Sequence, residues 1–306
     1  MKKLIVILGP TASGKSEMAV KLALWLCSNR VKKKFKINGA EIISADSRQV
    51  YKGMDIGTGK ITKKEMKSIP HHLLNIASPK RKFTVVQYQK LALKTINEIF
   101  KKDKIPILCG GTGFYISAVI DGLIFPKIKP DWKLRTKFEK KNIEQLFKLL
   151  EKLDPRRAKT IEKKNKRRII RALEIIIKTK KPIPILKKQT PKFKILIIGI
   201  KKSPQELKKL IKIRLKKRFK KGMLAEIKKL KSSLSWKRLE EFGLEYRWIA
   251  YYLQNKINYK EMIEKLQKEI EHFAKRQMTW FKKDKRIHWI KNQKEAEKLV
   301  KNFLAK

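Results

Sequence analysis

Eight residues near the N-terminus, Gly9-Pro10-Thr11-Ala12-Ser13-Gly14-Lys15-Ser16, match the phosphate-binding pattern G-x-x-x-x-G-K-[ST] at every fixed position. Glycines let backbone N–H groups curl around an anion, and a helix beginning near Lys15 adds its positive N-terminal end. Lys15 supplies a mobile positive charge, and the Ser16 hydroxyl suits a magnesium ion. The pattern predicts a polyphosphate site, but it leaves open which phosphate compound binds there.

A second polar cluster, residues 45–51, follows an apolar segment and contains Asp46. In open α/β sheets, ligands bind beyond the carboxyl ends of the strands, which is where Asp46 is expected. Two roles stay open for this carboxylate. It is a helix cap or a magnesium ligand in one interpretation, and a general base facing the phosphate site in the other.

Arginine is the more informative cation here, because lysine is abundant in a way that an AT-rich genome would produce. Arginines three or four residues apart on a helix share a face, as Arg168 does with Arg171 and Arg214 with Arg218. The candidate anion contacts are Arg167, Arg168, Arg171, Arg214, Arg218 and Arg276. A solvated basic face is the alternative. Around Arg276, residues 275–281 interleave basic and aromatic side chains, which can clamp RNA or belong to the core.

The elements that would position these residues follow from hydrophobic patterning. Buried parallel strands are predicted at residues 4–8, 41–44, 105–109 and 193–200, with a last short strand at 286–290. Helices are predicted at residues 17–26, 84–101, 245–254 and 259–283, and one long helix runs from 207 through 227. Residues 30–38 are expected to form a basic loop. Repeated strand–helix units predict a parallel sheet.

The hydrophobic pattern of the sequence changes near residue 126. Residues 131–181 are predicted to form amphipathic helices, and they contain no convincing strand. We therefore predict an α/β fold, a P-loop NTPase-like parallel-sheet core with an all-helical insertion domain. The predicted parts are residues 1–126 for the first part of the core, 127–190 for the insertion, and 191–306 for the returning strand and C-terminal helices.

Composition narrows the function classes. The 306 residues carry a formal charge of +53, which favours nucleic acid as a partner, although lysine bias explains part of it. No apolar run approaches the roughly 18–20 residues of a membrane helix. The two cysteines, Cys27 and Cys109, are expected to be free thiols of a reducing compartment, and the chain starts directly with a strand rather than a signal peptide. We expect a cytoplasmic protein that uses no membrane.

Two enzyme classes fit poorly. A GTPase would show Asn-Lys-x-Asp for guanine, and the sequence lacks it. A motor ATPase would place an acid directly after a buried strand, whereas residues 105–109 lead into glycines. The adjacent His71 and His72 are expected to hydrogen-bond rather than share a metal, because neighbours on extended chain point to opposite faces.

Seven blocks, in order along nearly the whole chain, closely resemble the tRNA dimethylallyltransferases, also called tRNA isopentenyltransferases. They are GPTASGKS (9–16), ADSRQVYKGMDIGTGK (45–60), PHHLLNI (70–76), GGTGFY (110–115), RRIIRALE (167–174), GMLAEI (222–227) and AKRQMTWF (274–281). The first two together are far more specific than a phosphate-binding loop alone.

The resemblance implies transfer of a dimethylallyl group from dimethylallyl diphosphate to the exocyclic amine of the adenosine on the 3′ side of the anticodon. The loop would then hold the departing diphosphate, with Lys15, Ser16 and Mg²⁺ neutralising its charge. Asp46 would be the general base, and Arg214 would help to hold the diphosphate. The implied catalytic residues are Asp46, Ser16 and Arg214.

For the tRNA partner, the resemblance implies contacts from the recognition loop, the glycine-rich loop and the insertion. The implied residues are Asp46, Ser47, Arg48, Gln49, Thr112, Arg135, Arg167, Arg168, Arg171 and Arg276. The target base would leave its stack to reach a buried site. A monomer is expected.

The sequence departs from the family pattern at Leu210, where an arginine often stands, so Arg218 or Lys201 is a candidate replacement. Two other functions remain open. A small-molecule P-loop kinase would use Asp46 to activate a hydroxyl, and a non-catalytic RNA-binding protein would use the loop only structurally.

Overall fold

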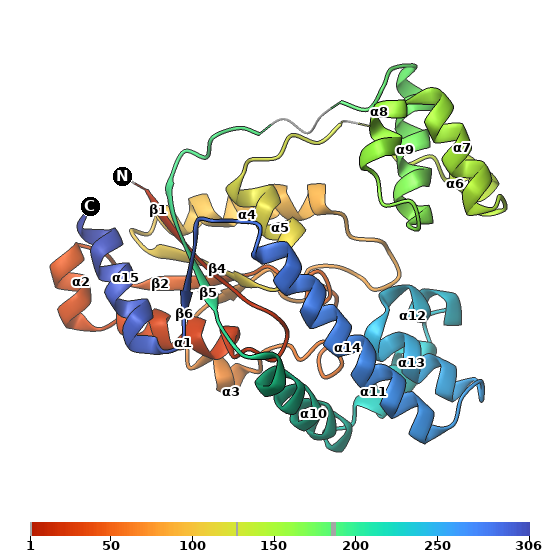
Figure 1. The fold of residues 1–306 in the computed structure, drawn as a ribbon. Helices are drawn as coiled ribbons and strands as arrows, with labels where there is room; N and C mark the ends of the chain where they lie inside the picture. Colours follow the sequence, from red (N-terminus) through yellow and green to blue (C-terminus); the bar gives the residue numbers. More distant parts are fainter. Residues whose placement is uncertain (1, 127, 185–187) are drawn as a thin grey trace. The chain divides into compact units, whose positions relative to one another are not determined.

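The core of the protein is one six-stranded sheet in the order β3-β2-β4-β1-β5-β6, in which every pair of neighbours is parallel (Figure 1). The computed structural model describes residues 2–126, 128–184 and 188–306. The strands are β1 (Lys3–Leu8), β2 (Ala40–Ser44), β3 (His71–His72), β4 (Ile105–Gly110), β5 (Lys194–Ile200) and β6 (Ile287–Ile290). The predicted α/β class with a parallel sheet is confirmed.

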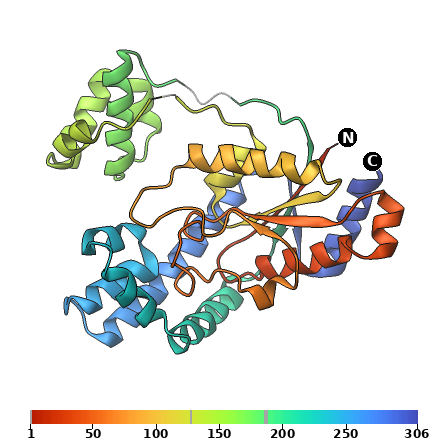
Figure 2. The same ribbon diagram turned by 180° about the vertical axis from the view of Figure 1, so that it is seen from behind.

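Alternating side chains of β1 separate the core into two layers, because successive residues of a strand point to opposite faces. Leu4 and Val6 pack on one face and Ile5 and Ile7 on the other, all with no exposed surface. The helices α1 (Lys15–Leu26), α2 (Asn29–Phe35) and α15 (Gln293–Ala305) cover the second face (Figure 2).

The first face is covered by helices from both halves of the sequence (Figure 1). They are α4 (Val85–Phe100), α5 (Gly113–Ile120) and α14 (Tyr259–Phe281), which packs on α5. Beside the sheet, α10 (Pro204–Lys220), α11 (Met223–Lys231), α12 (Trp236–Phe242) and α13 (Leu244–Leu253) pack against one another and against α14. The four-residue α3 (Lys63–Met66) lies in the connection between β2 and β3. Consequently, C-terminal helices reach residues at the carboxyl ends of the N-terminal strands.

Two local predictions were wrong. Residues 30–38 are mostly helical, because α2 covers Asn29–Phe35 and buries Val31 against the second face of the sheet. The long helix expected from residue 207 to 227 is two helices, α10 and α11. Gly222 separates them with a φ of 92°, a left-handed conformation that glycine tolerates and that ends the regular periodicity.

Residues 123–189 form a second compact unit, and residues 1–122 with 190–306 form the first. The second unit contains α6 (Trp132–Glu139), α7 (Ile143–Leu153), α8 (Pro155–Thr160) and α9 (Lys166–Thr179) around its own core of Leu146, Leu150, Ile169 and Leu173. The predicted insertion, 127–190, begins at a residue that lies outside the described part of the chain.

A buried carboxylate organises this second unit. Glu174 has no exposed surface and accepts hydrogen bonds from Arg135 Nε at 2.9 Å, from the backbone N–H of Asp131 at 2.6 Å, and from Arg171. Ionic pairing of this kind satisfies a buried charge that would otherwise be costly. Glu174 therefore joins α6 to α9.

None of the helices in the described ranges is sufficiently long and apolar to cross a membrane.

Candidate active site

The predicted phosphate-binding residues form a loop between β1 and α1. Gly14 precedes the first turn of α1 with a φ of 85°, and Ala12 also has a positive φ of 62°. A side chain at Gly9 would come within 2.7 Å of Ser13 Oγ. These requirements explain why glycine stands at both ends of the motif. The loop's N–H groups and the N-terminus of a twelve-residue helix suit an anion.

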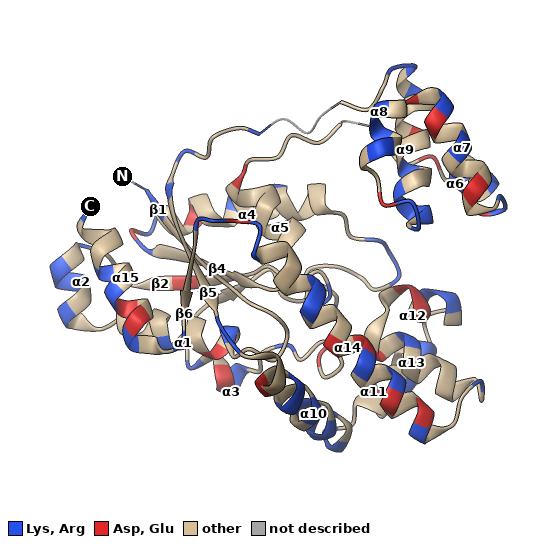
Figure 3. Cartoon of the chain, in the orientation of Figure 1, with Lys and Arg blue, Asp and Glu red and all other residues tan. Residues whose placement is uncertain are grey.

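Three cationic side chains gather beside the loop. Lys15 Nζ donates to the Pro10 carbonyl at 3.1 Å, and Arg214 of α10 donates to Thr11 Oγ1 and to the Gly59 carbonyl, both at 3.4 Å. Arg218, one turn further along α10, donates to the Gly57 carbonyl at 3.1 Å. The basic residues of α10 are visible in Figure 3.

Burial and mutual repulsion make protonation of these cations less favourable. Burial, followed by the charge of Arg214, lowers the pKa of Lys15 to about 8. Burial, followed by the charge of Arg218, lowers the pKa of Arg214 to about 10. A bound polyanion would relieve this repulsion, so the cluster suits an anionic ligand.

Asp46 lies two residues after the end of β2, and its charge raises the pKa of both Lys15 and Arg214 against the lowering influences. Its Oδ1 accepts the backbone N–H groups of Arg48 at 2.8 Å and Gln49 at 3.3 Å. The structure has no helix directly after this carboxylate, so Asp46 caps the turn of residues 47–50 and not the helix that the sequence had suggested. Only Oδ1 is used in the cap, so the geometry is compatible with a base at the same residue.

The residues that follow Asp46 are held by hydrogen bonds to other loops and to α12. Thr112 Oγ1 accepts the N–H of Ser47 at 3.0 Å, which joins the loop after β2 to the loop after β4. Gln49 Nε2 donates to the Gly59 carbonyl at 3.3 Å. Arg48 Nε donates to the Phe242 carbonyl at 2.8 Å. These residues lie together at the carboxyl ends of β2 and β4, as their positions in the sequence predicted.

Gln277 on α14 is a site residue that the sequence did not single out. Its Oε1 accepts the N–H of Thr11 at 2.8 Å, and its Nε2 donates to the Gly111 carbonyl at 2.8 Å. One buried amide therefore fixes the phosphate-binding loop relative to the glycine-rich loop after β4. The residue stands in the AKRQMTWF block, but its partners are more than 160 positions away.

Glu226 on α11 was also missed. Its carboxylate accepts three consecutive backbone N–H groups, from Asp55 at 2.9 Å, Ile56 at 2.6 Å and Gly57 at 3.0 Å, and the Tyr246 hydroxyl at 3.0 Å. The loop held in this way carries the carbonyls to which Arg214 and Arg218 donate. Glu226 thus positions both arginines through the backbone of residues 55–59.

We expect Glu226→Gln to weaken the binding of inorganic diphosphate about tenfold, because charge-assisted hydrogen bonds of this kind contribute roughly 1.5–3 kcal/mol each. Titration calorimetry measures the affinity. Tyr246→Phe, which removes one of the four contacts and leaves the backbone ones, is the matched control and should change it much less. Equal affinity for Glu226→Gln and the unaltered chain would disprove the positioning role.

Arg218 brings a second α10 guanidinium to the site of a chain that has Leu210 where the family often has an arginine. It is 9% exposed, pairs with Glu245 at 2.7 Å, and lies beside Gly59, where a side chain would meet both α10 guanidinium groups. Removing one partner of such a buried pair costs about 3–5 kcal/mol. Arg218 therefore contributes charge to the site and stability to the fold. Lys201 is exposed.

The arginines of the second unit differ in their surroundings. Arg135 and Arg171 are both bound to the buried Glu174. Arg168 is exposed and pairs with Glu162 at 3.3 Å, and Arg167 is exposed. Two guanidinium groups are therefore held by a buried carboxylate while remaining partly exposed, and two are exposed.

Near the glycine-rich loop of the first unit, Arg276 is exposed, and its guanidinium lies 5.9 Å from the ring of Phe273. Trp280 is 44% exposed and packs edge-on against Phe114. The histidines outside this region behave as predicted: His72 Nε2 contacts Glu41 at 2.7 Å and His71 Nδ1 contacts the Ile69 carbonyl at 2.8 Å.

Ser16 is exposed in the first turn of α1, as a magnesium ligand should be. Within the described residues, no group of three or more His, Cys, Asp and Glu side chains could hold a metal. Magnesium commonly binds through one or two protein oxygens plus substrate phosphates and water. The residues fit a metal ion that arrives with a polyphosphate, and not a self-contained protein cage.

With this geometry in place, comparison with known proteins is informative. The family described as IPP transferase matches residues 49–284. The chain belongs to this family. A tRNA dimethylallyltransferase of Carboxydothermus hydrogenoformans is 40% identical over 99% of this chain and 96% of its own length. Another, from Syntrophus aciditrophicus, is 41% identical over 95% and 94%.

Solved structures agree with this IPP transferase membership. The full-length tRNA isopentenylpyrophosphate transferase of Bacillus halodurans superposes with a TM-score of 0.72 at 34% identity, and covers 100% of this chain and 96% of its own. A eukaryotic dimethylallyltransferase acting on tRNA gives a TM-score of 0.71 at 26% identity over 92% of this chain and 70% of its own. The predicted family resemblance is confirmed.

Proposed function

We propose that this chain transfers a dimethylallyl group from dimethylallyl diphosphate to the exocyclic amine of the adenosine on the 3′ side of the anticodon in tRNA. The bond between the allylic carbon and the diphosphate oxygen breaks, a carbon–nitrogen bond forms, and diphosphate leaves. The observation that carries this proposal is the cluster of Lys15, Arg214 and Arg218 around the phosphate-binding loop, with Asp46 at the end of the next strand. Family membership supports it.

The cations stabilise the leaving group. Negative charge accumulates on the departing diphosphate in the transition state, and prearranged donors in a low-dielectric site stabilise that charge without reorganising. Lys15 and Arg214 are fixed by contacts within the loop before the reaction. We propose that Ser16 and the diphosphate oxygens hold Mg²⁺, which supplies additional charge neutralisation when bound.

Asp46 takes the proton from the adenine amine as that nitrogen attacks. An aromatic amine is a poor nucleophile, so a positioned base and a stabilised leaving group supply what the reaction lacks in water. The cap that Asp46 forms with the N–H groups of Arg48 and Gln49 holds the carboxylate in one orientation.

The tRNA contacts that we propose lie in both units. In the first unit they are Asp46, Ser47, Arg48, Gln49, Thr112 and Arg276, and in the second unit Arg135, Arg167, Arg168 and Arg171. The exposed Arg167 and Arg168 are suited to phosphate contacts. Since Arg135 and Arg171 are bound to Glu174, we expect them to shape the surface that their helices present.

A P-loop kinase acting on a small molecule is the competing function, and the names of the relatives speak against it. We propose a monomer that works in the cytoplasm, where tRNA is found. Incubation with tRNA and either labelled dimethylallyl diphosphate or γ-labelled ATP separates the two functions. Label should enter tRNA from the allylic donor alone, and phosphate transfer to a metabolite would overturn the proposal.

The pH dependence of donor binding follows from Lys15. Its pKa of about 8 means that the ammonium is charged below that pH and loses its charge as the pH rises. A bound diphosphate favours the charged form, so affinity for dimethylallyl diphosphate should be highest below pH 8 and should fall above it. Titration calorimetry between about pH 7 and 9.5 measures this. Lys15→Arg should flatten the profile, and a flat profile in the unaltered chain would contradict the assignment.

A further inference from the structure

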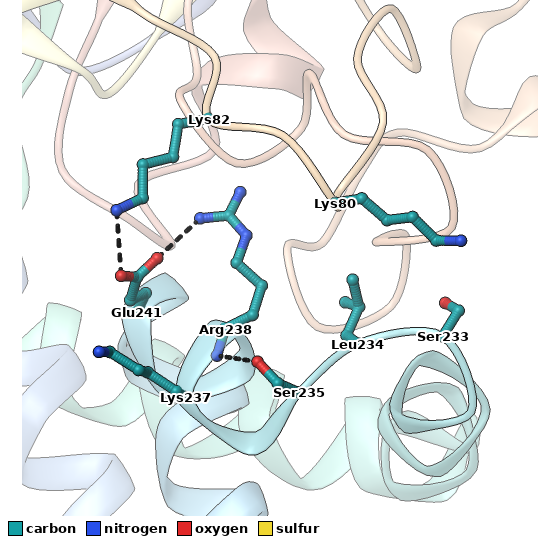
Figure 4. A pocket seen from close by; sticks show the side chains of 8 residues that line it. All are labelled: Lys80, Lys82, Ser233, Leu234, Ser235, Lys237, Arg238 and Glu241. Atoms are coloured by element: carbon teal, nitrogen blue, oxygen red, sulfur yellow. Dashed lines mark hydrogen bonds and ion pairs between the residues drawn. The ribbon is translucent and has the colours of Figure 1, made fainter. Parts of the chain in front are cut away.

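A hollow of about 440 Å³ lies on the first unit, between the connection that follows β3 and the α11–α12 segment (Figure 4). Its lining includes Lys80, Lys82, Ser235, Lys237, Arg238 and Glu241. Four of these side chains are basic. Among the described residues that line the hollow, Glu241 alone is acidic.

That carboxylate is already used. Glu241 Oε1 lies 3.1 Å from Lys82 Nζ, and Oε2 lies 3.0 Å from an Arg238 nitrogen. Lys80 and Lys237 are exposed, and within the described chain neither has an acidic group at ion-pair distance. The hollow therefore presents positive charge that the protein does not neutralise.

Arg238 holds the two walls of the hollow together. Its Nε donates to the Pro79 carbonyl at 2.8 Å, a second nitrogen donates to the Arg81 carbonyl at 2.9 Å, and its guanidinium lies 4.3 Å from the Phe242 ring. These contacts join the two walls, and a surface held in one arrangement loses less entropy when a partner binds.

The hollow also adjoins the recognition loop. The ring of Phe242 lies near two guanidinium groups, 4.3 Å from that of Arg238, which lines the hollow, and 5.8 Å from that of Arg48, which lies in the turn after Asp46. The N–H of Phe83, which follows Lys82 of the lining, donates to the Tyr51 hydroxyl at 3.0 Å. One ring, Phe242, therefore separates the lining of the hollow from the turn that carries Arg48.

We propose that this hollow binds the sugar–phosphate backbone of the tRNA whose adenosine is presented to Asp46, with Lys80 and Lys237 contacting phosphates. Such contacts orient the RNA without reading its sequence. The inference rests on the proposed function for the identity of the polyanion. An acidic protein surface is the other chemistry that fits a basic hollow, and the test below separates them.

The test uses the full chain with Lys80→Ala and Lys237→Ala together. Binding of unmodified tRNA is measured by filter retention between about 50 and 200 mM salt. We expect affinity at 100 mM to fall roughly tenfold, and the slope of log K against log salt to become less steep by about 1 to 2 because two phosphate contacts are lost. The KM for tRNA should rise with the dissociation constant.

The matched control is Lys33→Ala with Lys34→Ala. Both side chains are exposed on α2, so this double substitution removes the same charge at a place far from α12 (Figures 1 and 2). The control should keep the slope and affinity. Thermal melts establish that both variants are folded.

If the two double variants gave the same slope of log K against log salt, the proposal would be overturned and an acidic protein would be left as the candidate partner. If the unaltered chain transferred no dimethylallyl group but the salt slope still changed only for the first pair, the RNA surface would stand and the proposed function would fail.

Discussion

Asp46→Asn is expected to lower the turnover number for dimethylallyl transfer by roughly a hundredfold or more, because general-base catalysis typically contributes a factor of about 10² to 10⁴. The amide keeps an oxygen at the position of Oδ1, so it can still accept the N–H groups of Arg48 and Gln49. It cannot accept the proton of the adenine amine. Single-turnover kinetics with saturating tRNA and donor measure the effect.

Asp46→Ala is the companion variant, since it removes both the base and the cap. Binding of tRNA should be nearly unchanged in Asp46→Asn and somewhat weaker in Asp46→Ala. Normal turnover in Asp46→Asn would assign the carboxylate to the turn alone, and the base would have to be sought elsewhere.

Arg214→Met is expected to lower kcat/KM for dimethylallyl diphosphate by roughly 10² to 10³, the usual effect of losing one donor to a developing negative charge. Among the described residues its hydrogen-bond partners are Thr11 Oγ1 and the Gly59 carbonyl, both at 3.4 Å. Burial and Arg218 already lower its pKa to about 10, so removing this cation relieves repulsion.

The thermal midpoint of Arg214→Met without ligand should therefore be equal to or higher than that of the unaltered chain. Arg214→Lys retains a charge and should recover part of the rate. A variant that lost stability but kept its kcat/KM would show that Arg214 supports the fold and not the leaving group.

The local sequence pattern was sufficient to predict the parts of the site that are continuous in sequence. The phosphate-binding loop needs a buried strand, glycines at fixed positions and a following helix, and all three occur within residues 3–26. Asp46 was placed correctly because residues after parallel strands meet at one edge of the sheet.

Contacts between distant segments could not be predicted in this way. Gln277 and Glu226 each bind backbone groups more than 160 positions away, and nothing in their immediate neighbourhood distinguishes them from other polar helix residues. Backbone N–H and C=O groups are the same in almost every residue type, so the sequence does not indicate which side chain binds them in the folded chain.

The positions of the arginines in the sequence likewise did not show whether each one contacts a ligand or a carboxylate of the protein. Arg168 and Arg171 share a helix and a spacing that favours anion contacts, yet Arg171 is bound to the buried Glu174 while Arg168 is exposed. The sequence shows the cations but not which carboxylate neutralises each of them. The α2 helix was missed for a related reason, because its lysines obscured the single buried Val31.

In the proposed reaction the phosphates at the loop belong to a leaving group, and RNA is the acceptor. Incubating the chain with tRNA, Mg²⁺ and dimethylallyl diphosphate, followed by nuclease digestion and mass analysis, tests this most directly. We predict one dimethylallyl-adenosine per tRNA, on the 3′ side of the anticodon, with one diphosphate released for each. Unmodified tRNA under these conditions, or phosphate transferred from ATP to an acceptor, would contradict the account.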